Sequence, residues 1–571
     1  MLDVLKSKVV QGALFVFLVS YVVRFLVKGL RIRKRRLQYP GAPPSWIFGD
    51  LKSVGEIASQ LPNRVHPHTY AHYMRKKHNL GNWFALDFWP VSDPMLAILD
   101  PAICQQFSTE HNTPKHSSLP VFLEHLVGKD DMVSLNGALW KKWRSMFNPG
   151  FSTQHLLTLV PGIVDDALIY VDKLTEHAKK NEIFRLEEET TRLTVDIIGQ
   201  VVLDVRFNMQ RGNNECIDAL REQINLLPNE TLNPFAMWRP YGIYRRWRNN
   251  RIMHRYIGKV LDERFATKET PAKEKKARKR TIIDLALDSY LTGDETLENE
   301  DPDAVTTTND HPIMDAAFRE GAITQIRIFL FAGHDTTSST ICYIFHLLRQ
   351  NPDVLARLRH EHEEILGPAS STASAIQSDP NLLHKLEYTL CVIKETLRLF
   401  PAASAPRQGD KGLFLTDPTT GEKFSTEGWM IWLVHHGLGH NEEIWGADVD
   451  EFKPERFLAP SNHHHNAHKI PEGAFRAFEL GHRNCLGQNL ALLEARIILA
   501  LTCRTLEFDV CLDAESLEAV GKDGTFYAKD ASFRKGKVHD VEGEELYQVL
   551  IGAAKPREGM PCRARMVDWK P

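Results

Sequence analysis

The 571-residue chain is poor in cysteine and has no marked excess of charge of either sign. Eight cysteines over this length are too few for a scaffold built on disulfide bonds. The 70 basic and 73 acidic residues leave a formal net charge of −3, which disfavours a general nucleic-acid binder, because such proteins usually carry a clear basic excess. With 43% hydrophobic and 25% charged residues, the chain is not fibrous, collagen-like or wholly disordered.

Long hydrophobic runs are also scarce, and the one that stands out lies near the N-terminus. Val9 to Val27 is apolar at all but a few positions, and as a helix it would span roughly 28 Å, close to the thickness of a bilayer core. A cleaved signal peptide is the alternative, but it would have a shorter apolar run and a small-residue cleavage site. Instead, basic residues follow the run, namely Lys28, Arg31, Arg33, Lys34, Arg35 and Arg36. The sequence therefore predicts an uncleaved signal-anchor, with the body of the protein in the cytosol.

Proline marks the boundary between this anchor and the rest of the chain. Pro40, Pro43 and Pro44 predict a stiff, non-helical spacer. We therefore expect a membrane anchor with a basic flank over residues 1–36, a proline-rich spacer over 37–44 and one large domain over 45–571. No internal repeat or long flexible linker is evident in that domain.

The apolar pattern of the large domain is mainly helical. Its two longest helical stretches are Phe318–Gln350, which Asn351-Pro352 ends, and Leu382–Phe400, which Pro401 ends. Short strand-like segments are Met95–Leu99, Met430–Val434 and Tyr547–Ile551. The expected fold class is therefore mainly α with small β-sheets.

The segment Phe478–Gly487, FELGHRNCLG, places a cysteine in a glycine-flanked loop before a predicted helix. Gly481 and Gly487 permit backbone conformations that other residues resist. Arg483 places a permanent positive charge near the sulfur of Cys485, and the helix that follows would add its N-terminal dipole. A lone cysteine is most often an inert buried residue. These surroundings instead favour an anionic sulfur that can act as a ligand.

This loop resembles the haem-binding signature F-x-x-G-x-R-x-C-x-G of the cytochrome P-450 family, and all five fixed positions match. The resemblance implies that Cys485 is the thiolate ligand of the iron of haem b, with Phe478 packed beside it. It also implies that Arg483 pairs with a haem propionate. The fold that it implies is a single large haem domain, preceded here by an N-terminal transmembrane helix.

A second motif, Ala332–Thr337 (AGHDTT), lies inside the longer predicted helix. A glycine beside an Asp-Thr pair weakens a helical turn and supplies an acid next to an alcohol. A polar turn that faces solvent is the plain alternative, but apolar neighbours on both sides favour burial. By resemblance, the motif covers the distal face of the haem. Gly333 would then lie where the helix opens to admit O2, and Asp335 and Thr336 would relay protons.

Further motifs follow in the order that the family has them. Glu395 and Arg398 lie one turn apart on a predicted helix. By resemblance, Arg456 in the sequence PERF joins them in an ion-pair network that holds the fold and does no chemistry. The positions that contact haem propionates in this family correspond to Trp140, Arg144 and Arg407.

The anchor and the proline-rich spacer resemble those of microsomal members of the family. That resemblance implies a single-pass protein of the endoplasmic reticulum membrane, which receives electrons from NADPH through a reductase. The sequence GHRNCLGQ is similar to that of fungal members of the family from secondary metabolism. The expected reaction inserts one atom of O2 into a lipophilic small molecule, because the segments that would contact it are mostly apolar. By resemblance, these segments are Phe122–Val133, Ala332–Thr337, Ala402–Ala405 and Leu546–Ile551.

Two alternatives to a monooxygenase remain open. A haem-dependent isomerase or dehydratase would not depend on NADPH, and a non-enzymatic membrane haem protein would not consume oxygen with a coupled reductase. The intact Asp335–Thr336 pair disfavours both. A separate group of histidines, His463–His465 and His468, could bind a metal, but a solvated tract is favoured because no cysteine or carboxylate completes a site.

Overall fold

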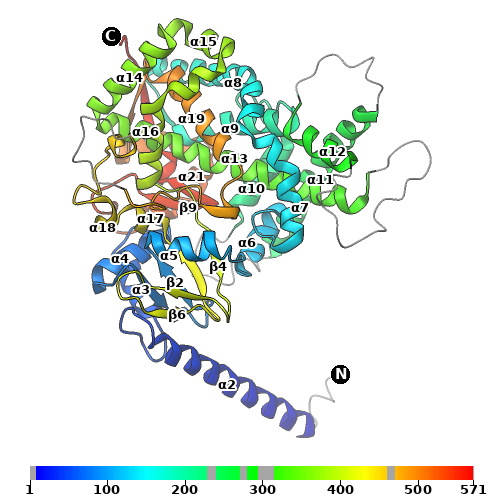
Figure 1. Ribbon diagram of the computed structural model, residues 1–571, viewed down its shortest axis with the longest axis vertical. Helices are drawn as coiled ribbons and strands as arrows, with labels where there is room; N and C mark the ends of the chain where they lie inside the picture. The colour runs from blue at the N-terminus through cyan, green and yellow to red at the C-terminus, as the bar shows by residue number, and fades with distance from the viewer. Residues whose placement is uncertain (1–7, 228–239, 270–279, 293–313, 459–469, 570–571) are drawn as a thin grey trace.

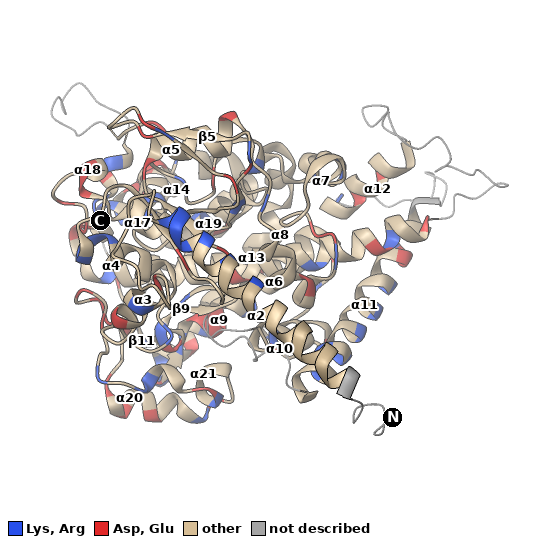
Figure 2. Ribbon diagram, turned by 90° about the horizontal axis from the view of Figure 1, so that it is seen from below, with Lys and Arg blue, Asp and Glu red and all other residues tan. Residues whose placement is uncertain are grey.

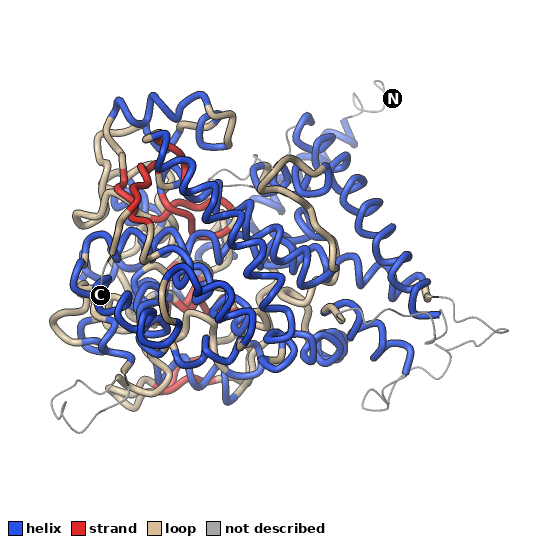
Figure 3. The backbone as a smooth tube through the Cα atoms, turned by 90° about the horizontal axis from the view of Figure 1, so that it is seen from above, coloured by secondary structure: helices blue, strands red, loops and turns tan. Residues whose placement is uncertain are grey.

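The computed structural model describes residues 8–227, 240–269, 280–292, 314–458 and 470–569. Helices make up most of the described chain, and short strands form small sheets among them (Figures 1 and 3). This arrangement confirms the mainly α fold class that the sequence predicts. The histidine tract at 463–468 lies outside the described residues.

The helices follow one another along the whole chain. Those of the first half are α2 (Lys8–Arg36), α3 (Leu51–Ala58), α4 (His68–His78), α5 (Pro101–Gln105), α6 (Ser118–Val127), α7 (Gly137–Phe147), α8 (Thr153–Lys180), α9 (Leu186–Leu203), α10 (Glu215–Asn225), α11 (Pro240–Glu269) and α12 (Ile282–Thr292). Those of the second half are α13 (Ala316–Gln350), α14 (Pro352–Leu366), α15 (Thr372–Ser378), α16 (Glu387–Leu399), α17 (His435–Gly439), α18 (Glu442–Trp445), α19 (Gln488–Thr502), α20 (Ala514–Ala519) and α21 (Phe526–Lys529).

The strands form four sheets, and only one pair among those described is parallel. The largest sheet has the order β1-β2-β7-β4, with β2 and β7 parallel. The others are β3-β11-β8, β10-β9 and β5-β6, all antiparallel. The bounds are β1 Trp83–Leu86, β2 Met95–Ile98, β3 Ile183–Arg185, β4 Arg407–Gln408, β5 Phe414–Thr416, β6 Lys423–Ser425, β7 Met430–Leu433, β8 Leu506–Val510, β9 Gln548–Ile551, β10 Ala553–Pro556 and β11 Pro561–Met566. The three strand-like segments of the sequence thus correspond to β2, β7 and β9.

The long helix α13 passes through the middle of the molecule (Figure 1). Its N-terminus is capped by Asp315, whose Oδ2 accepts the backbone N–H of Phe318 at 2.9 Å. It ends at Gln350, before the proline that cannot continue it. Most of its side chains are buried in the main apolar core, which also contains residues of α8, α9 and α19. The helix predicted over Phe318–Gln350 is therefore confirmed, with two further residues at its start.

The second predicted helix is shorter than its apolar pattern suggests. Pro380–Lys385 forms a 3-10 turn, and α16 begins only at Glu387. Asp379 caps this turn by accepting the N–H of Asn381 at 3.1 Å. The capped turn changes the chain direction before α16, which a reading of periodicity alone does not detect.

The N-terminal helix α2 projects from the body of the protein (Figure 1). It is long and apolar enough to cross a membrane, and its apolar window has no buried side chains. Residues 37–44, expected to form a spacer, lie against the domain. Ala42 is buried, the Pro40 carbonyl accepts the N–H of Ala85 at 2.8 Å, and the Tyr39 hydroxyl donates to Ser425 O at 2.8 Å. Proline removes a donor from the backbone but leaves its carbonyl free to pair in this way.

Candidate cofactor site

The site is built around the loop Phe478–Gly487, which ends where α19 begins. The backbone N–H of Cys485 donates to the carbonyl of Phe478 at 2.8 Å and closes the loop. Gly481 has a φ of +75°, and a Cβ there would lie 2.8 Å from the carbonyl oxygen of Ser108. Glycine is therefore required at this position by both conformation and space.

The exposure of Cys485 and the pKa of its thiol together indicate that the sulfur lines a hollow. Seven of the eight cysteines are buried, and Cys485 alone is exposed. Nevertheless, burial by the surrounding protein raises the pKa of its thiol. The two observations agree if the sulfur lines an enclosed space. The backbone N–H groups of Gly487 and Gln488 and the charge of Arg144 oppose the effect of burial and favour the thiolate.

Four cationic side chains act on one another beside this loop: Lys115, Arg144, Arg407 and Arg483. Burial lowers the pKa of each of them. For Arg483 the pKa falls to about 9, because the charges of Arg407 and Arg144 add to the effect of burial. Like charges removed from water repel one another, so this cluster is unfavourable without an anion between its members.

The hydrogen bonds of these cations leave part of their capacity unused. Arg407 donates through Nη1 to Thr113 O at 2.9 Å, while its buried Nε and Nη2 have no partner among the described residues. Arg483 donates to Leu135 O at 2.6 Å, and its guanidinium lies 4.3 Å from the centroid of the Trp140 ring. Trp140 thus acts by stacking on Arg483.

Arg144 is held by the cysteine loop itself. Its Nη1 donates to Asn484 O at 2.8 Å and its Nη2 to Asn484 Oδ1 at 2.7 Å. Asn484, the residue next to Cys485, is therefore held by a side chain of α7. The predicted residues Arg144, Arg483 and Trp140 come together in this way on one side of the loop.

These residues fit haem. The Cys485 sulfur would supply a ligand for the haem iron, and desolvated cations with free N–H groups match the two carboxylates that haem carries. The sequence missed Lys115, because no motif surrounds it and it reaches Arg407 only through a backbone bridge between two distant segments. The assignment of each residue to a particular part of the haem stays a prediction.

The Glu479 side chain also has a specific place in the loop. Its backbone has a φ of +57°, and its Oε1 lies 2.7 Å from Arg476 Nη1 and accepts the N–H of Leu480 at 3.1 Å. Burial alone would raise the pKa of this carboxyl, but the nearby charges of His435, Arg476 and Arg407 outweigh it and lower the pKa. Glu479 therefore carries a negative charge that partly balances the cation cluster.

The AGHDTT turn lies in the middle of α13, where part of the helix surface is open. Ala332, Gly333 and Thr336 are partly exposed, although buried residues precede and follow them. The hydroxyl of Thr336 donates to the carbonyl of Ala332 at 2.9 Å, within the helix. This open stretch of a buried helix indicates that Ala332 and Thr336 border a hollow.

Asp335 is directed to different partners from those of Thr336. Its Oδ2 accepts the N–H of Ala553 at 2.7 Å, and its Oδ1 lies 2.7 Å from Lys555 Nζ, both on β10. Lys555 also forms an ion pair with Glu187 at the start of α9. No hydrogen bond joins the Asp335 and Thr336 side chains in the described part of the chain. The sequence placed the acid beside the alcohol but could not detect Lys555 or Glu187, which lie far away along the chain.

A polar cavity of about 690 Å³ adjoins this buried ion-pair group. Its walls include Glu187, Lys555, His334 and Asp335, and toward the outside Arg192, Asp218, Arg221, Glu222, Asp523 and Lys529. Burial would lower the pKa of the Lys555 ammonium, but Asp335 and Glu187 outweigh it and raise the pKa. Lys555 is therefore a fixed positive charge between two carboxylates.

Gly333, predicted to border the haem, has a packing contact of its own. A Cβ on Gly333 would lie 2.8 Å from the side chain of Ile198 on α9. Glycine at this position thus lets α9 and α13 approach closely, and a larger side chain would push them apart.

Two polar side chains of α13 fix the loop after α6. Gln325 accepts the N–H of Met132 and donates to Asp130 O, both at 2.8 Å. Arg327 donates to Leu126 O at 2.5 Å and to Asn250 Oδ1. The first predicted substrate segment, Phe122–Val133, is therefore attached to α13 by hydrogen bonds from buried side chains.

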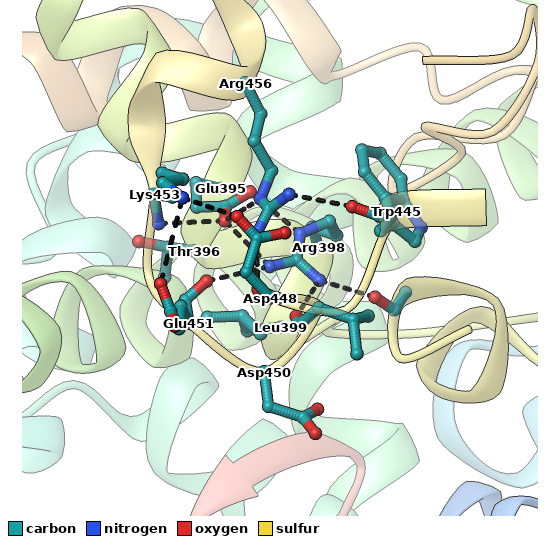
Figure 4. A network of polar contacts seen from close by, with 12 residues as sticks. Glu395, Thr396, Arg398, Leu399, Trp445, Asp448, Asp450, Glu451, Lys453 and Arg456 are labelled. Carbon is teal, nitrogen blue, oxygen red and sulfur yellow. Dashed lines mark hydrogen bonds and ion pairs between the residues drawn. The ribbon is translucent and has the colours of Figure 1, made fainter. Parts of the chain in front are cut away.

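The third group of predicted residues forms a buried network away from the sulfur (Figure 4). Arg398 donates to Glu395 through Nε at 2.8 Å and through Nη2 at 2.7 Å, and Arg456 Nε lies 3.2 Å from Glu395 Oε1. Arg398 Nη1 also donates to the carbonyls of Gly439 and Val449. The network joins α16 to the segments after β7, which agrees with a structural role.

Comparison with known proteins gives a consistent result over the chain. A family model for cytochrome P450 matches residues 40–522. The chain is 34% identical to the cytochrome P450 monooxygenase polC of Polytolypa hystricis, over 96% of this chain and 94% of that protein. It is 33% identical to the cytochrome P450 monooxygenase acrF of Aspergillus aculeatus, over 88% of this chain and 98% of that protein. Similarity extends to human cytochrome P450 4Z1, at 27% identity over 73% of this chain and 75% of that protein.

Proposed function

Because the chain belongs to the cytochrome P450 family and is a monooxygenase, we propose that it oxidises a lipophilic small molecule in fungal secondary metabolism. The chemistry that haem supplies when bound is the reductive activation of O2, in which one oxygen atom enters the substrate and the other leaves as water. The observation that carries the proposal is the enclosed Cys485 sulfur beside a set of buried, incompletely paired cations.

Cys485 would hold the haem iron as a thiolate, and the groups around it partly offset the rise in its pKa that burial causes. Backbone N–H groups from Gly487 and Gln488 direct positive dipoles at the sulfur, and Arg144 adds a full charge nearby. Phe478 lies at the start of the same closed loop and packs against the core. The loop therefore holds the ligand in place.

The haem propionates would be bound by four cationic side chains, those of Lys115, Arg144, Arg407 and Arg483. The free N–H groups of Arg407 are the best placed to donate to a carboxylate, because they are buried and have no partner in the described chain. Trp140 keeps the guanidinium of Arg483 in position by stacking on it. Occupation by two carboxylates would remove the repulsion among these four cations.

Asp335 and Thr336 deliver protons to the distal side. Water in the polar cavity of about 690 Å³ brings protons to Asp335, which Lys555 and the Ala553 N–H hold in place. A rotation of the Asp335 side chain about its own bonds would then bring the proton closer to Thr336, which borders the hollow. Thr336 Oγ1, now bonded to Ala332 O, then donates at the distal face.

The proposal extends to the substrate contacts and the partners of the enzyme. Phe122–Val133, Ala402–Ala405 and Leu546–Ile551 line the substrate space in this proposal, together with the α13 turn, and their apolar content suits a lipophilic molecule. A reductase supplies electrons from NADPH. The apolar helix α2 supports a single-pass location in the endoplasmic reticulum membrane, with the large domain in the cytosol.

The reduced membrane fraction, treated with carbon monoxide, provides the decisive test. A Soret band at the position typical of thiolate-ligated haem is expected, together with oxygen uptake that requires both NADPH and an added reductase. Cys485→Ser should remove the thiolate band, whereas Cys511→Ser, which changes a cysteine outside the site, should leave it unchanged. A thiolate band that persists in Cys485→Ser would refute the ligand assignment. A thiolate band without NADPH-dependent oxygen uptake would refute the monooxygenase cycle.

A further inference from the structure

A second cavity, of about 670 Å³, lies between the segment after β8 and the base of the β9–β10 hairpin. Its walls come from positions 512–522, which include α20, from Arg534 and His539, and from Glu545 and Arg557 near the two ends of the hairpin. Figure 2 shows α20 and α21 at one edge of the molecule, where blue and red positions lie close together. None of the wall residues lines the cavity beside the buried ion-pair group of α13, so the two cavities are separate.

Arg557 is 5% exposed and forms the floor of this second cavity. The rim is formed by exposed residues, namely Glu518, Lys522, His539 and Glu545. Arg557 Nη1 donates to His539 O at 2.8 Å and to Glu545 O at 3.3 Å, and the guanidinium lies 5.4 Å from the centroid of the Tyr547 ring. Its buried Nε has no partner among the described residues. The guanidinium is therefore fixed in place while part of its donor capacity is unused.

The charge of Arg557 has no carboxylate partner in the described part of the chain, because its printed contacts are to carbonyls and to a ring. The neighbouring carboxylate, Glu558, is fully buried but is taken by another arginine. Arg534 donates to Glu558 from Nε and, at 2.7 Å, from Nη2. Arg185 Nη2 also lies 3.8 Å from Glu558. A buried guanidinium without a counter-charge is costly, so Arg557 favours an anion in the cavity.

The chemistry of the walls defines the kind of anion. Arginine donors held in a plane suit the oxygens of a carboxylate or phosphate group. Lys522 adds a positive charge at the rim, but Glu518 and Glu545 lie there too and would repel a polyanion. The volume is that of a site for a small molecule. The ligand class is therefore a small organic anion with one carboxylate or phosphate group.

Arg557 also connects this cavity to the acid of α13, because it directly follows β10. Its backbone N–H donates to Tyr547 O at 3.0 Å and closes the base of the β9–β10 hairpin. Within the same strand, Lys555 and Ala553 hold the carboxylate of Asp335. A ligand that fixes Arg557 would make opening of the hairpin less favourable, and the position of Asp335 depends on that hairpin.

We propose that this cavity is an effector site for a small organic anion, whose carboxylate or phosphate group binds Arg557 and thereby stabilises the β9–β10 hairpin. The binding step does not depend on the haem chemistry. Its consequence for oxidation rests on the proposed function, in which Asp335 delivers protons. The negative group can belong to a carboxylate metabolite or to phosphate, and the experiment uses one probe of each kind.

Isothermal titration calorimetry of the full holoenzyme in detergent tests the binding step. Inorganic phosphate and lactate are each titrated at constant ionic strength, with chloride as the replaced anion. We expect saturable binding at one site, and the tighter of the two probes identifies the group that the site prefers. Arg557→Gln should weaken this binding by about tenfold or more. Lys535→Gln, at an exposed lysine outside the cavity, should leave it unchanged. Absence of saturable binding for both probes, or equal affinity in Arg557→Gln, would overturn the proposal.

A second variant blocks the cavity and leaves Arg557 in place, because loss of Arg557 also removes its bonds to two carbonyls. Ala514 is an exposed residue of the cavity wall, and Ala514→Trp would fill the space next to it. Ala519→Trp, at an exposed alanine of the same helix outside the wall, is the matched control. The carbon-monoxide spectrum shows that each variant is folded with haem. Ala514→Trp should lose binding and Ala519→Trp should keep it, whereas full binding in Ala514→Trp would refute this cavity as the site.

Hydrogen–deuterium exchange of the peptide 547–557 tests the effect on the hairpin. The tighter probe should slow exchange of this peptide in the wild type, and the protection should be lost in Ala514→Trp. Strand β5, in a separate sheet, is the internal control and should exchange at the same rate with and without the probe. Binding by calorimetry without protection of the hairpin would refute the effector role. Neither measurement uses turnover, so failure here is distinct from failure of the monooxygenase proposal, which the carbon-monoxide band and oxygen uptake decide.

Discussion

At the scale of single residues, the acid and the alcohol of α13 have separate environments. Thr336 bonds within its own helix, while Asp335 is held by Lys555 and by the backbone of β10. The two residues are adjacent in sequence, and yet a helix turns by about 100° from one residue to the next, which points their side chains in different directions. Substitutions at these two positions should therefore affect the reaction in different ways.

Thr336→Ala should keep the haem spectrum and the rate of NADPH consumption but divert reducing equivalents to hydrogen peroxide, because the last donor on the distal side is lost. Asp335→Asn should instead slow NADPH consumption by ~10²-fold and raise the solvent deuterium isotope effect, because a general acid is lost earlier in the path. Peroxide yield and isotope effect are measured on both variants. Identical profiles for the two would contradict separate roles.

Lys555→Gln tests whether the ion pair matters to the relay. Without the ammonium, Asp335 and Glu187 lose the cation between them, so we expect slower NADPH consumption and a larger isotope effect, in the same direction as Asp335→Asn. Lys529→Gln alters another lysine of the same cavity that has no such contact with Asp335, and it is the control. Unchanged isotope effects in Lys555→Gln would remove Lys555 from the path.

At this scale the functional residues that can be predicted from the sequence are those that lie close together in the chain. The loop Phe478–Gly487 and the turn Ala332–Thr337 carry their own signals, because their chemistry and their conformation are local. Lys115, Glu187 and Lys555 carry none. Each becomes relevant only when segments more than a hundred residues apart are packed together, and that packing is not encoded in any short pattern.

At the scale of elements, the network around Glu395 fixes α16 to the segments after β7. Glu395 is fully buried, and it accepts hydrogen bonds from Arg398, Arg456 and the backbone N–H of Lys453. Removing one partner of a buried pair leaves the other charge without compensation. The network therefore contributes to stability mainly through the cost of breaking it.

Glu395→Gln should lower the free energy of unfolding by ~3–5 kcal/mol, because Arg398 and Arg456 would lose their buried counter-charge. The thermal midpoint of the holoenzyme and the fraction that retains haem on heating are the measurements. Glu455→Gln, at an exposed acidic position that pairs with Arg357, should cost less than ~1 kcal/mol. A similar loss in the two variants would contradict the special role of the buried network.

The sequence predicted these elements unevenly. α13 was predicted nearly to its ends, since its cap and its terminal proline are local signals. The start of α16 was wrong by several residues because a capped 3-10 turn continues the apolar pattern. The anchor was predicted as an apolar helix with a basic flank, but the burial of Arg33 and Arg36, which form ion pairs with Asp87 and Asp50, was missed, since charge alone does not reveal where those carboxylates will lie.

At the scale of the whole molecule, buried histidines connect stability to pH. His68 on α4 stacks on His436 of α17 with ring centroids 4.6 Å apart, and burial lowers the pKa of both well below the usual value. For His66 and His362, burial lowers the pKa to about 3. These side chains stay neutral in the folded protein while the unfolded chain takes up protons near pH 6.5. Their contribution to the free energy of unfolding is therefore fully present above pH 6.5, and it is lost as the pH falls toward 3.

His362→Gln should reduce this acid sensitivity. His362 Nε2 lies 2.9 Å from Thr389 Oγ1, so an amide can retain a polar contact at the same place. Between pH 7 and pH 5 the free energy of unfolding should fall by about 2 kcal/mol more in the wild type than in the variant, because one histidine takes up a proton only in the unfolded chain. Denaturant midpoints at the two pH values give the comparison. His360→Gln, an exposed histidine on the same helix, should behave as wild type.

The hydrogen bond between Ala553 and Asp335 limits how the substrate range of this enzyme can be changed. The N–H of Ala553 that holds Asp335 belongs to the same β9–β10 hairpin as the apolar residues proposed to contact substrate. Reshaping that hairpin to admit a new molecule would therefore also move the acid that governs how efficiently electrons are used. Laboratory evolution of this region should yield variants that bind a new compound and yet waste most of their reductant. The second round of improvement would then have to restore Asp335 and leave the pocket as it is.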